Sequence, residues 1–285
     1  MSFFSSDIVT LKLVTFPPRI RQFWTVPFVS QKKSATYEQL TPNIVFLVMA
    51  ITFLKANWEN LIMANYEVEP SILKPYLPKG VELDFYKYKT YVSLVGFMFK
   101  KTSLFGVPIP FFGSFEEINL RFYVRKVEGK KIKKGVVFIN ETVPFKIVAL
   151  LANKLYKEHY ISIPTKNFIN KDEHKNIQYK WKMKDKWNSI TVQSDTNKYK
   201  IEPSSIEEFI FERYFGFTKI SPSSTQEYRI HHPKWMTHKI LNNSIDCDFG
   251  PMYGNAFASL NDQAPNSIII AEGSEVRVNW KRTKF

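Results

Sequence analysis

The segment Phe115-Glu116-Glu117-Ile118-Asn119-Leu120-Arg121-Phe122-Tyr123-Val124 alternates apolar and polar side chains with the two-residue period of a β-strand. One face of this strand is entirely apolar. The other face carries a carboxylate, an amide, a guanidinium and a phenol, from Glu117, Asn119, Arg121 and Tyr123. Two interpretations are open. The strand belongs to a sheet with one face in solvent, where such alternation is common, or its polar face grips a small polar or anionic ligand.

The composition favours a β-rich domain with a few helices, an α+β protein dominated by its sheet. Of the 285 residues 44% are hydrophobic and 16% aromatic, enough for a packed core. Short runs rich in β-branched and aromatic residues are separated by Gly and Pro. The single cysteine, Cys247, excludes an internal disulfide and predicts a reducing compartment, which we take to be the cytoplasm.

The net charge of +14 raises the question of a nucleic-acid partner. Basic residues concentrate in 125–134 and in 166–200, and the second cluster also contains Tyr179, Trp181 and Trp187. The sequence shows no helix-turn-helix, zinc-finger, RRM or KH signature, and lysine greatly outnumbers arginine, the side chain that suits phosphate and base recognition. We therefore interpret these clusters as a solvated surface and do not expect nucleic acid as a partner.

Residues 1–48 differ from the rest of the chain and predict a separate N-terminal extension. They contain two adjacent prolines and a polar stretch, and Met49 offers an alternative start. The extension is expected to be either an artefact of the gene model or a disordered tail, and 49–285 to form one domain. The apolar run 44–54 is too short to span a bilayer, so no membrane association is expected.

The pattern along 49–285 predicts mostly strands. The expected strands are 58–68, 81–86, 91–99, 115–124, 135–143, 177–183, 189–193, 226–231 and 267–280. A hairpin turn is expected around Glu128-Gly129-Lys130, a short helical turn at 70–78, and helices at 144–157 and from Ser204 or Ser205 to Tyr214.

Several separated motifs together resemble the YqjF-like family, the domain of unknown function 2071. They are Leu73-x-x-Tyr76-Leu77-Pro78-x-Gly80-Val81-Glu82-Leu83-Asp84, Glu117-x-Asn119-x-Arg121-x-Tyr123-Val124, Gly135-Val136-Val137-Phe138, Glu212-Arg213-Tyr214 and His232-Pro233-x-Trp235. That family looks related to the acetoacetate decarboxylase-like superfamily. The resemblance implies a bent antiparallel sheet that closes into a β-barrel around a small-molecule pocket, with the polar face of 117–123 pointing inward.

The decarboxylase chemistry does not carry over with the resemblance. It requires a Schiff-base lysine whose pKa is lowered by a second lysine in a dry site. Here Lys157 stands beside Glu158, which would hold its amine protonated. The pairs Lys130-Lys131 and Lys133-Lys134 fall at the expected hairpin tip, where water surrounds them. We therefore expect no acetoacetate decarboxylase activity.

Other catalytic and metal-binding signatures are missing from the sequence. The histidines form no metal motif, and neither a nucleophile elbow nor a phosphate- or dinucleotide-binding loop occurs, so we expect no metal and no cofactor. His159 and His232 complete the predicted ligand-binding set, although the His232-Pro233 segment equally fits a structural corner.

Two functions of different class remain. The first is a small-molecule-binding module that holds an anionic or carbonyl-bearing compound through Arg121. The alternative is a lysine-independent lyase or hydrolase that uses Glu117 or His159 as an acid or base. The sequence is compatible with a homo-oligomer in either case.

Overall fold

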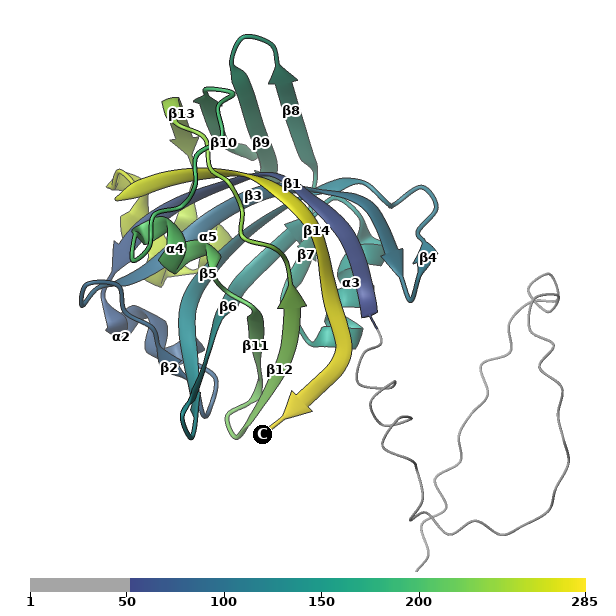
Figure 1. Cartoon of the computed structure of the whole chain (residues 1–285), viewed down its shortest axis with the longest axis vertical. Helices are drawn as coiled ribbons and strands as arrows, with labels where there is room; N and C mark the ends of the chain where they lie inside the picture. The colour runs from purple at the N-terminus through teal and green to yellow at the C-terminus, as the bar shows by residue number, and fades with distance from the viewer. Residues whose placement is uncertain (1–51) are drawn as a thin grey trace, which may run out of the picture. The chain divides into compact units, whose positions relative to one another are not determined.

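The computed structural model describes residues 52–285, so the predicted N-terminal extension 1–48 lies outside the described residues. The described part is mainly β with a few helices, which confirms the predicted class, and its long strands are strongly curved (Figure 1). The strands are β1 (Thr52–Val68), β2 (Glu82–Leu83), β3 (Thr90–Leu104), β4 (Val107–Pro108), β5 (Phe115–Glu128), β6 (Lys131–Val143), β7 (Tyr160–Ser162), β8 (Thr165–Lys171), β9 (Lys175–Met183), β10 (Lys186–Ser194), β11 (Phe215–Ser221), β12 (Ser224–His231), β13 (Ile240–Asp246) and β14 (Ser267–Lys284).

The helices are short, and several match the predicted starts. They are α2 (Pro70–Leu73), η2 (Lys74–Tyr76), α3 (Lys146–Tyr156), α4 (Ile206–Phe211), α5 (Phe249–Tyr253) and η3 (Asn255–Asp262). Ser205 caps α4, because its side chain accepts a hydrogen bond from the backbone N–H of Glu208 at 3.1 Å. α3 ends at Tyr156, and the C-cap residue Lys157 that follows adopts a left-handed backbone with φ of 61°.

The larger sheet has ten strands, and β5 lies between β3 and β6. From β5 the pairings run through β3, β1, β14, β12 and β11 to β6, and β6 pairs again with β5. Most pairs are antiparallel, as predicted. β6, however, pairs in parallel with both β11 and β7, so the sheet is mixed. Parallel pairing needs a crossover, and α3 supplies it between β6 and β7.

A second sheet of four strands packs against the larger one in the order β13-β10-β9-β8. Its contact side includes Tyr179 and Trp181, both with no exposed surface. The Tyr179 hydroxyl donates to the Asn60 carbonyl at 2.9 Å. Asn167 on β8 donates to Glu116 on β5 at 2.8 Å. Tyr179 and Trp181 of the second basic cluster are thus core residues and give no nucleic-acid surface.

Both faces of β5 are buried, so the prediction of a two-residue alternation is confirmed but the solvent-facing interpretation is wrong. The apolar face packs into a core shared with the four-stranded sheet, α5 and η3; it comprises Ile118, Leu120, Phe122 and Val124. The polar face is no more exposed: Glu117, Asn119, Arg121 and Tyr123 are 1–8% exposed. Ionisable side chains are rarely buried unless they have partners or a function.

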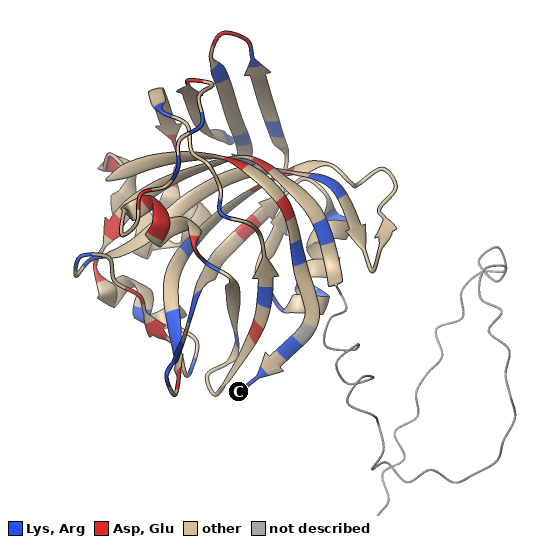
Figure 2. Ribbon diagram, in the orientation of Figure 1, with Lys and Arg blue, Asp and Glu red and all other residues tan. Residues whose placement is uncertain are grey.

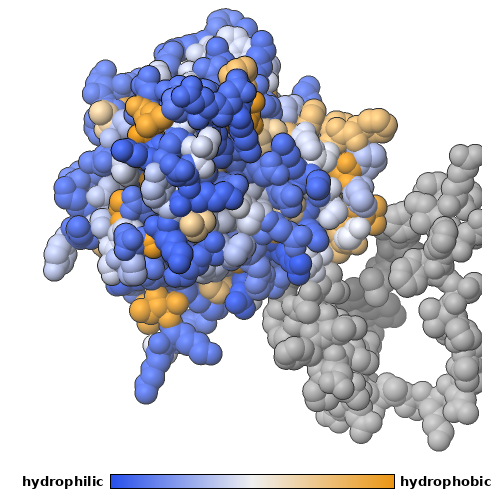
Figure 3. Space-filling model, turned by 45° about the horizontal axis from the view of Figure 1, so that its top comes forward, coloured by the Kyte–Doolittle hydropathy of each residue, from blue (hydrophilic) through white to orange (hydrophobic). Residues whose placement is uncertain are grey.

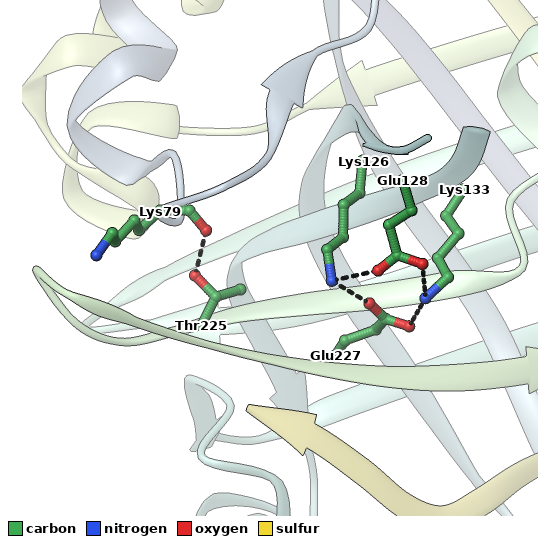
Figure 4. Close-up of polar contacts among 6 residues, drawn as sticks. All are labelled: Lys79, Lys126, Glu128, Lys133, Thr225 and Glu227. Carbon is green, nitrogen blue, oxygen red and sulfur yellow. Dashed lines mark hydrogen bonds and ion pairs between the residues drawn. The ribbon is translucent and has the colours of Figure 1, made fainter. Parts of the chain in front are cut away.

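The first basic cluster is the tip of the β5–β6 hairpin, as predicted (Figure 2). Lys126 and Lys133 each pair with both Glu128 and Glu227, at distances of 2.6–3.0 Å (Figure 4). Glu227 belongs to β12, so these ion pairs tie the hairpin to a strand distant in the chain. Part of the basic cluster is therefore neutralised within the fold.

Gly273 in β14 allows a close approach between β14 and β1. Its φ is +89°, and a Cβ atom there would overlap the carbonyl oxygen of Trp58. We predict that Gly273→Ala lowers the free energy of unfolding by several kcal/mol, since the backbone of β1 cannot move aside. Urea unfolding followed by circular dichroism measures the change.

Gly106 provides the matched control, because its φ of +79° is similar but a Cβ atom there would meet nothing within 4 Å. Gly106→Ala should cost about 1 kcal/mol, the cost of the left-handed backbone alone. Equal losses in the two variants would show that the contact with Trp58 is unimportant.

Candidate functional site

A cavity of about 130 Å³ lies on the polar side of β5. Its volume is close to the ~150 Å³ of engineered protein cavities that admit benzene, so it can hold a small molecule. Most of its wall is apolar, from strands of the larger sheet and from α3. The ionisable and amide side chains in the wall are Glu117, Asn119, Arg121, Glu141, Tyr156, Glu158, Tyr160 and Tyr228.

Three polar side chains form a row across neighbouring strands. Asn119 on β5 is in register with Glu141 on β6, which is in register with Tyr160 on β7. The register of β5 and β6 shifts between Leu120 and Arg121, which leaves Ile139 as an extra residue in β6. This β-bulge lets Phe138 and Glu141 both line the cavity, although strict alternation would put them on opposite faces.

Glu117 and Glu158 are held by hydrogen bonds from neighbouring side chains. Glu117 accepts from the Asn119 amide at 3.1 Å and from the Tyr160 hydroxyl at 2.9 Å. Glu158 accepts from the hydroxyls of Thr218 and Tyr228 at 2.6 and 2.7 Å. The two carboxyl groups are therefore fixed in position.

The three glutamates share one apolar environment, and this changes their acidity. Burial raises the pKa of Glu117 to about 7, although the hydrogen bonds from Asn119 and Tyr160 act in the opposite direction. Burial likewise raises the pKa of Glu158 to about 7. The pKa of Glu141 lies well above its usual range, first because of burial and then because of Glu158 and Glu117. Burial in this cavity therefore favours the neutral acid form of its carboxyl groups.

Arg121 is the cation of the cavity. Its Nη2 donates to the Ile210 carbonyl and to the Met63 sulfur, each at 3.4 Å. Among residues 52–285 its Nε has no hydrogen-bond partner. Within the described chain no ion pair joins Arg121 to Glu117, because Glu117 bonds to Asn119 and Tyr160 instead.

The structure brings three of the six predicted ligand-binding residues into the cavity wall: Glu117, Asn119 and Arg121. Tyr123 is fully buried beside them, but its hydroxyl contacts Ser93. The two histidines lie elsewhere. His159 is exposed. His232 is stacked between Tyr214 and Trp235, with ring centroids 4.7 and 4.3 Å away. This packing agrees with the alternative interpretation of the His232-Pro233 segment as a structural corner.

Sequence reasoning missed Glu141, Glu158, Tyr160 and Tyr228. No local signal identifies Glu141, because the bulge at Ile139 reverses the side of the strand that it faces. Glu158 follows the left-handed residue that ends α3, and this turn directs it into the interior while Lys157 stays exposed. The alternation of β12 could have identified Tyr228, since it shares a face with the buried Ile230.

Within residues 52–285, no lysine lines the cavity and no three His, Cys, Asp or Glu side chains are grouped closely enough to hold a metal ion. The helices of this part of the chain are all too short or too polar to cross a membrane.

Apolar side chains gather on the surface beside the cavity. The loop between β3 and β5 exposes Phe105, Val107 and Phe111, and α3 exposes Leu150. Figure 3 shows apolar surface on this side of the molecule. Neighbouring residues of the same loop and helix, Ile109 and Leu151, line the cavity. The loop between β3 and β5 and helix α3 thus connect the cavity wall with the apolar surface.

Several solved enzyme structures share this fold. An acetoacetate decarboxylase-like enzyme from Sphingomonas wittichii RW1 superposes with a TM-score of 0.57 at 11% identity, over 83% of this chain and 94% of its own. The enduracididine biosynthesis enzyme MppR, solved in complex with pyruvate, gives 0.58 at 10% identity over 83% and 91%. The acetoacetate decarboxylase of Legionella pneumophila gives 0.55 at 11% identity over 79% and 84%. The chain therefore has an acetoacetate decarboxylase-like fold.

Sequence comparison defines the family within this fold. The family model for domain of unknown function 2071, described as an uncharacterized conserved protein, matches residues 55–275. The chain belongs to this family, as its motifs predicted. The uncharacterized protein YqjF of Bacillus subtilis (strain 168) is 25% identical over 187 residues, which are 65% of this chain and 75% of YqjF.

The raised pKa values predict that stability falls as pH increases. A carboxyl with a higher pKa when folded binds more protons in the folded state, so its contribution is complete below the unfolded pKa near 4.5 and is lost as pH rises through about 7. Glu158→Gln should remove up to about 3 kcal/mol of the difference between the free energies of unfolding at pH 5 and pH 8. Chemical denaturation at the two pH values measures it.

The matched control is Glu173→Gln, which removes an exposed carboxyl from the β8–β9 turn. This variant should keep the pH dependence of the parent chain. If the pH dependence of stability is unchanged in Glu158→Gln, folding does not raise the pKa of Glu158.

Proposed function

We propose that this protein binds a small compound with a carboxylate or carbonyl group in the cavity beside β5. The larger sheet then works as a barrel that encloses the ligand, and the pairing of β5 with both β3 and β6 supports this. Arg121 is the anchor, and Glu117 and Asn119 orient the ligand. Glu141 and Glu158 complete the polar part of the wall.

The observation that carries the proposal is that the buried Arg121 guanidinium has few hydrogen-bond acceptors. A guanidinium cannot be neutralised by burial, so it needs acceptors. Arg121 is 8% exposed and bonds to one carbonyl and one sulfur, and its Nε has no partner among the described residues. An anionic or carbonyl oxygen in the cavity would satisfy this donor. The pyruvate bound to MppR gives an example of a ligand of this class in the same fold.

An enzyme that acts without a lysine is the second candidate, and the three buried carboxyl groups favour it. Groups with a pKa near the working pH are the most effective general acids and bases.

The proposed setting for either function is the cytoplasm, because the chain has a single cysteine. A homo-oligomer is compatible with both.

We predict that Arg121→Lys weakens the binding of pyruvate at least tenfold, about 1.4 kcal/mol, because an ammonium keeps the charge but loses the planar fork. Isothermal titration calorimetry at neutral pH measures the affinity. Arg125→Lys is the matched control, since Arg125 lies on the same strand but pairs with Glu82 at the surface. If pyruvate and acetoacetate both fail to bind the parent chain, the cavity does not serve this class of ligand.

We also predict that the protein forms no Schiff base. The cavity wall contains no lysine within the described residues, and Lys157 is exposed to water instead of lying in the dry site that a Schiff-base lysine requires. Incubation with acetoacetate and cyanoborohydride, followed by mass spectrometry, should leave the mass unchanged. A reduced adduct on Lys157 would contradict this expectation.

A further inference from the structure

We propose that Glu117 and Glu141 act as a base and an acid that enolise a small 2-oxo acid in the cavity, with Tyr160 joining the two carboxyl groups. This inference rests on the proposed binding function and adds a reaction to it. The reaction moves a proton between C3, the carbon next to the carbonyl, and the carbonyl oxygen, with no amine intermediate.

Glu141 is placed to be the acid. It lines the cavity, is 2% exposed, and its Oε2 has no hydrogen-bond partner among residues 52–285. Burial, and then the neighbouring carboxyls of Glu158 and Glu117, raise its pKa well above the usual range and so favour the protonated acid. A neutral carboxyl donates one hydrogen bond, and a ligand carbonyl in the cavity would accept it.

Glu117 is placed to be the base. Both of its oxygens accept hydrogen bonds, which stabilise the ionised form and fix its orientation. Its pKa of about 7 leaves an ionised fraction at neutral pH, in contrast to Glu141. Two neighbouring carboxyls with different acidities are the arrangement that acid–base catalysis requires.

Tyr160 connects the pair. Its hydroxyl donates to Glu117 Oε2 at 2.9 Å, and Tyr160 is in register with Glu141 on the adjacent strand. In the proposed reaction this hydroxyl relays a proton between the two carboxyls. Tyr160 contacts Glu117 and not the ligand anchor, so we assign it a positioning and relay role.

The reaction is balanced without a further reactant. Glu117 takes a proton from C3, the carbon next to the carbonyl, the C–H electron pair forms a C=C bond, and the carbonyl π pair moves to oxygen. That oxygen receives the proton of Glu141, while Arg121 holds the carboxylate of the substrate. The proton on Glu117 exchanges with solvent, and the reverse steps then return a solvent proton to C3 and restore both carboxyls. Nothing is oxidised or reduced, and the net result is exchange of a C3 hydrogen with solvent.

The wall chemistry favours this reaction class over others. Within the described chain the cavity wall contains no lysine, cysteine, serine or histidine. Carboxyls are the dominant reactive groups there, and the apolar surroundings strengthen their interactions with a developing oxyanion. The volume of about 130 Å³ restricts the substrate to a compound of few carbon atoms.

The test is the exchange of pyruvate methyl hydrogens in deuterated water, followed by proton NMR with the full chain. The parent chain should accelerate exchange over buffer. Glu141→Gln and Glu117→Gln should each slow the catalysed exchange about 10²-fold or more, the usual loss for a general acid or base. Tyr160→Phe should slow exchange while its dissociation constant for pyruvate stays close to that of the parent.

Glu173→Gln removes an exposed carboxyl and should exchange pyruvate at the parent rate. Melting temperatures and calorimetric binding of pyruvate identify any variant that fails to fold. If pyruvate binds the parent chain but its methyl hydrogens do not exchange, the enolisation is overturned and the proposed binding function stands. If pyruvate does not bind, both fail. Exchange that depends on a reducible amine adduct would also overturn the inference.

Discussion

The burial of both faces of β5 is the constraint on which the rest of the structure depends. A sheet with one wet face could expose Glu117 and Arg121 at little cost. Here the apolar face is covered by the four-stranded sheet, and the polar face is enclosed by the larger sheet and α3. The charged groups on that face must then find partners inside the protein, and the available partners are few. This enclosure accounts for the raised pKa values of the cavity carboxyls. It also accounts for the burial of the polar row formed by Asn119, Glu141 and Tyr160.

Much of the fold could be predicted from local sequence, because alternation, turn residues and helix caps act over short distances. The β5–β6 hairpin, the turn at Pro70 and the cap at Ser205 were each readable in this way. β7, β8, β11 and β13 were not, since each has at most seven residues, and β7 and β13 pair with strands farther away in the chain. The same limit applies to the site. Burial of Glu117 depends on strands far away in the chain, and no local pattern reports it.

The fold is shared with acetoacetate decarboxylase-like enzymes, and the chemistry of this cavity differs from a Schiff-base site in its charges. An amine nucleophile needs a neighbouring cation and a dry environment to become neutral. This cavity is largely apolar, but its ionisable groups are chiefly acids with one guanidinium. Burial here raises the pKa of carboxyl groups instead of lowering that of an amine. One fold can thus support opposite acid–base behaviour when the charge of a few inward residues changes.

The extra residue in β6 affects how function can be transferred between relatives. Glu141 faces the cavity because Ile139 is bulged. A homologue with glutamate in the same alignment column, but with a regular strand of equal length, would turn that carboxyl away from its ligand. Conversely, a homologue without the extra residue could keep the carboxyl inward despite a gap in the alignment. Strand register therefore has to be compared alongside residue identity before two members of this family are assigned the same chemistry.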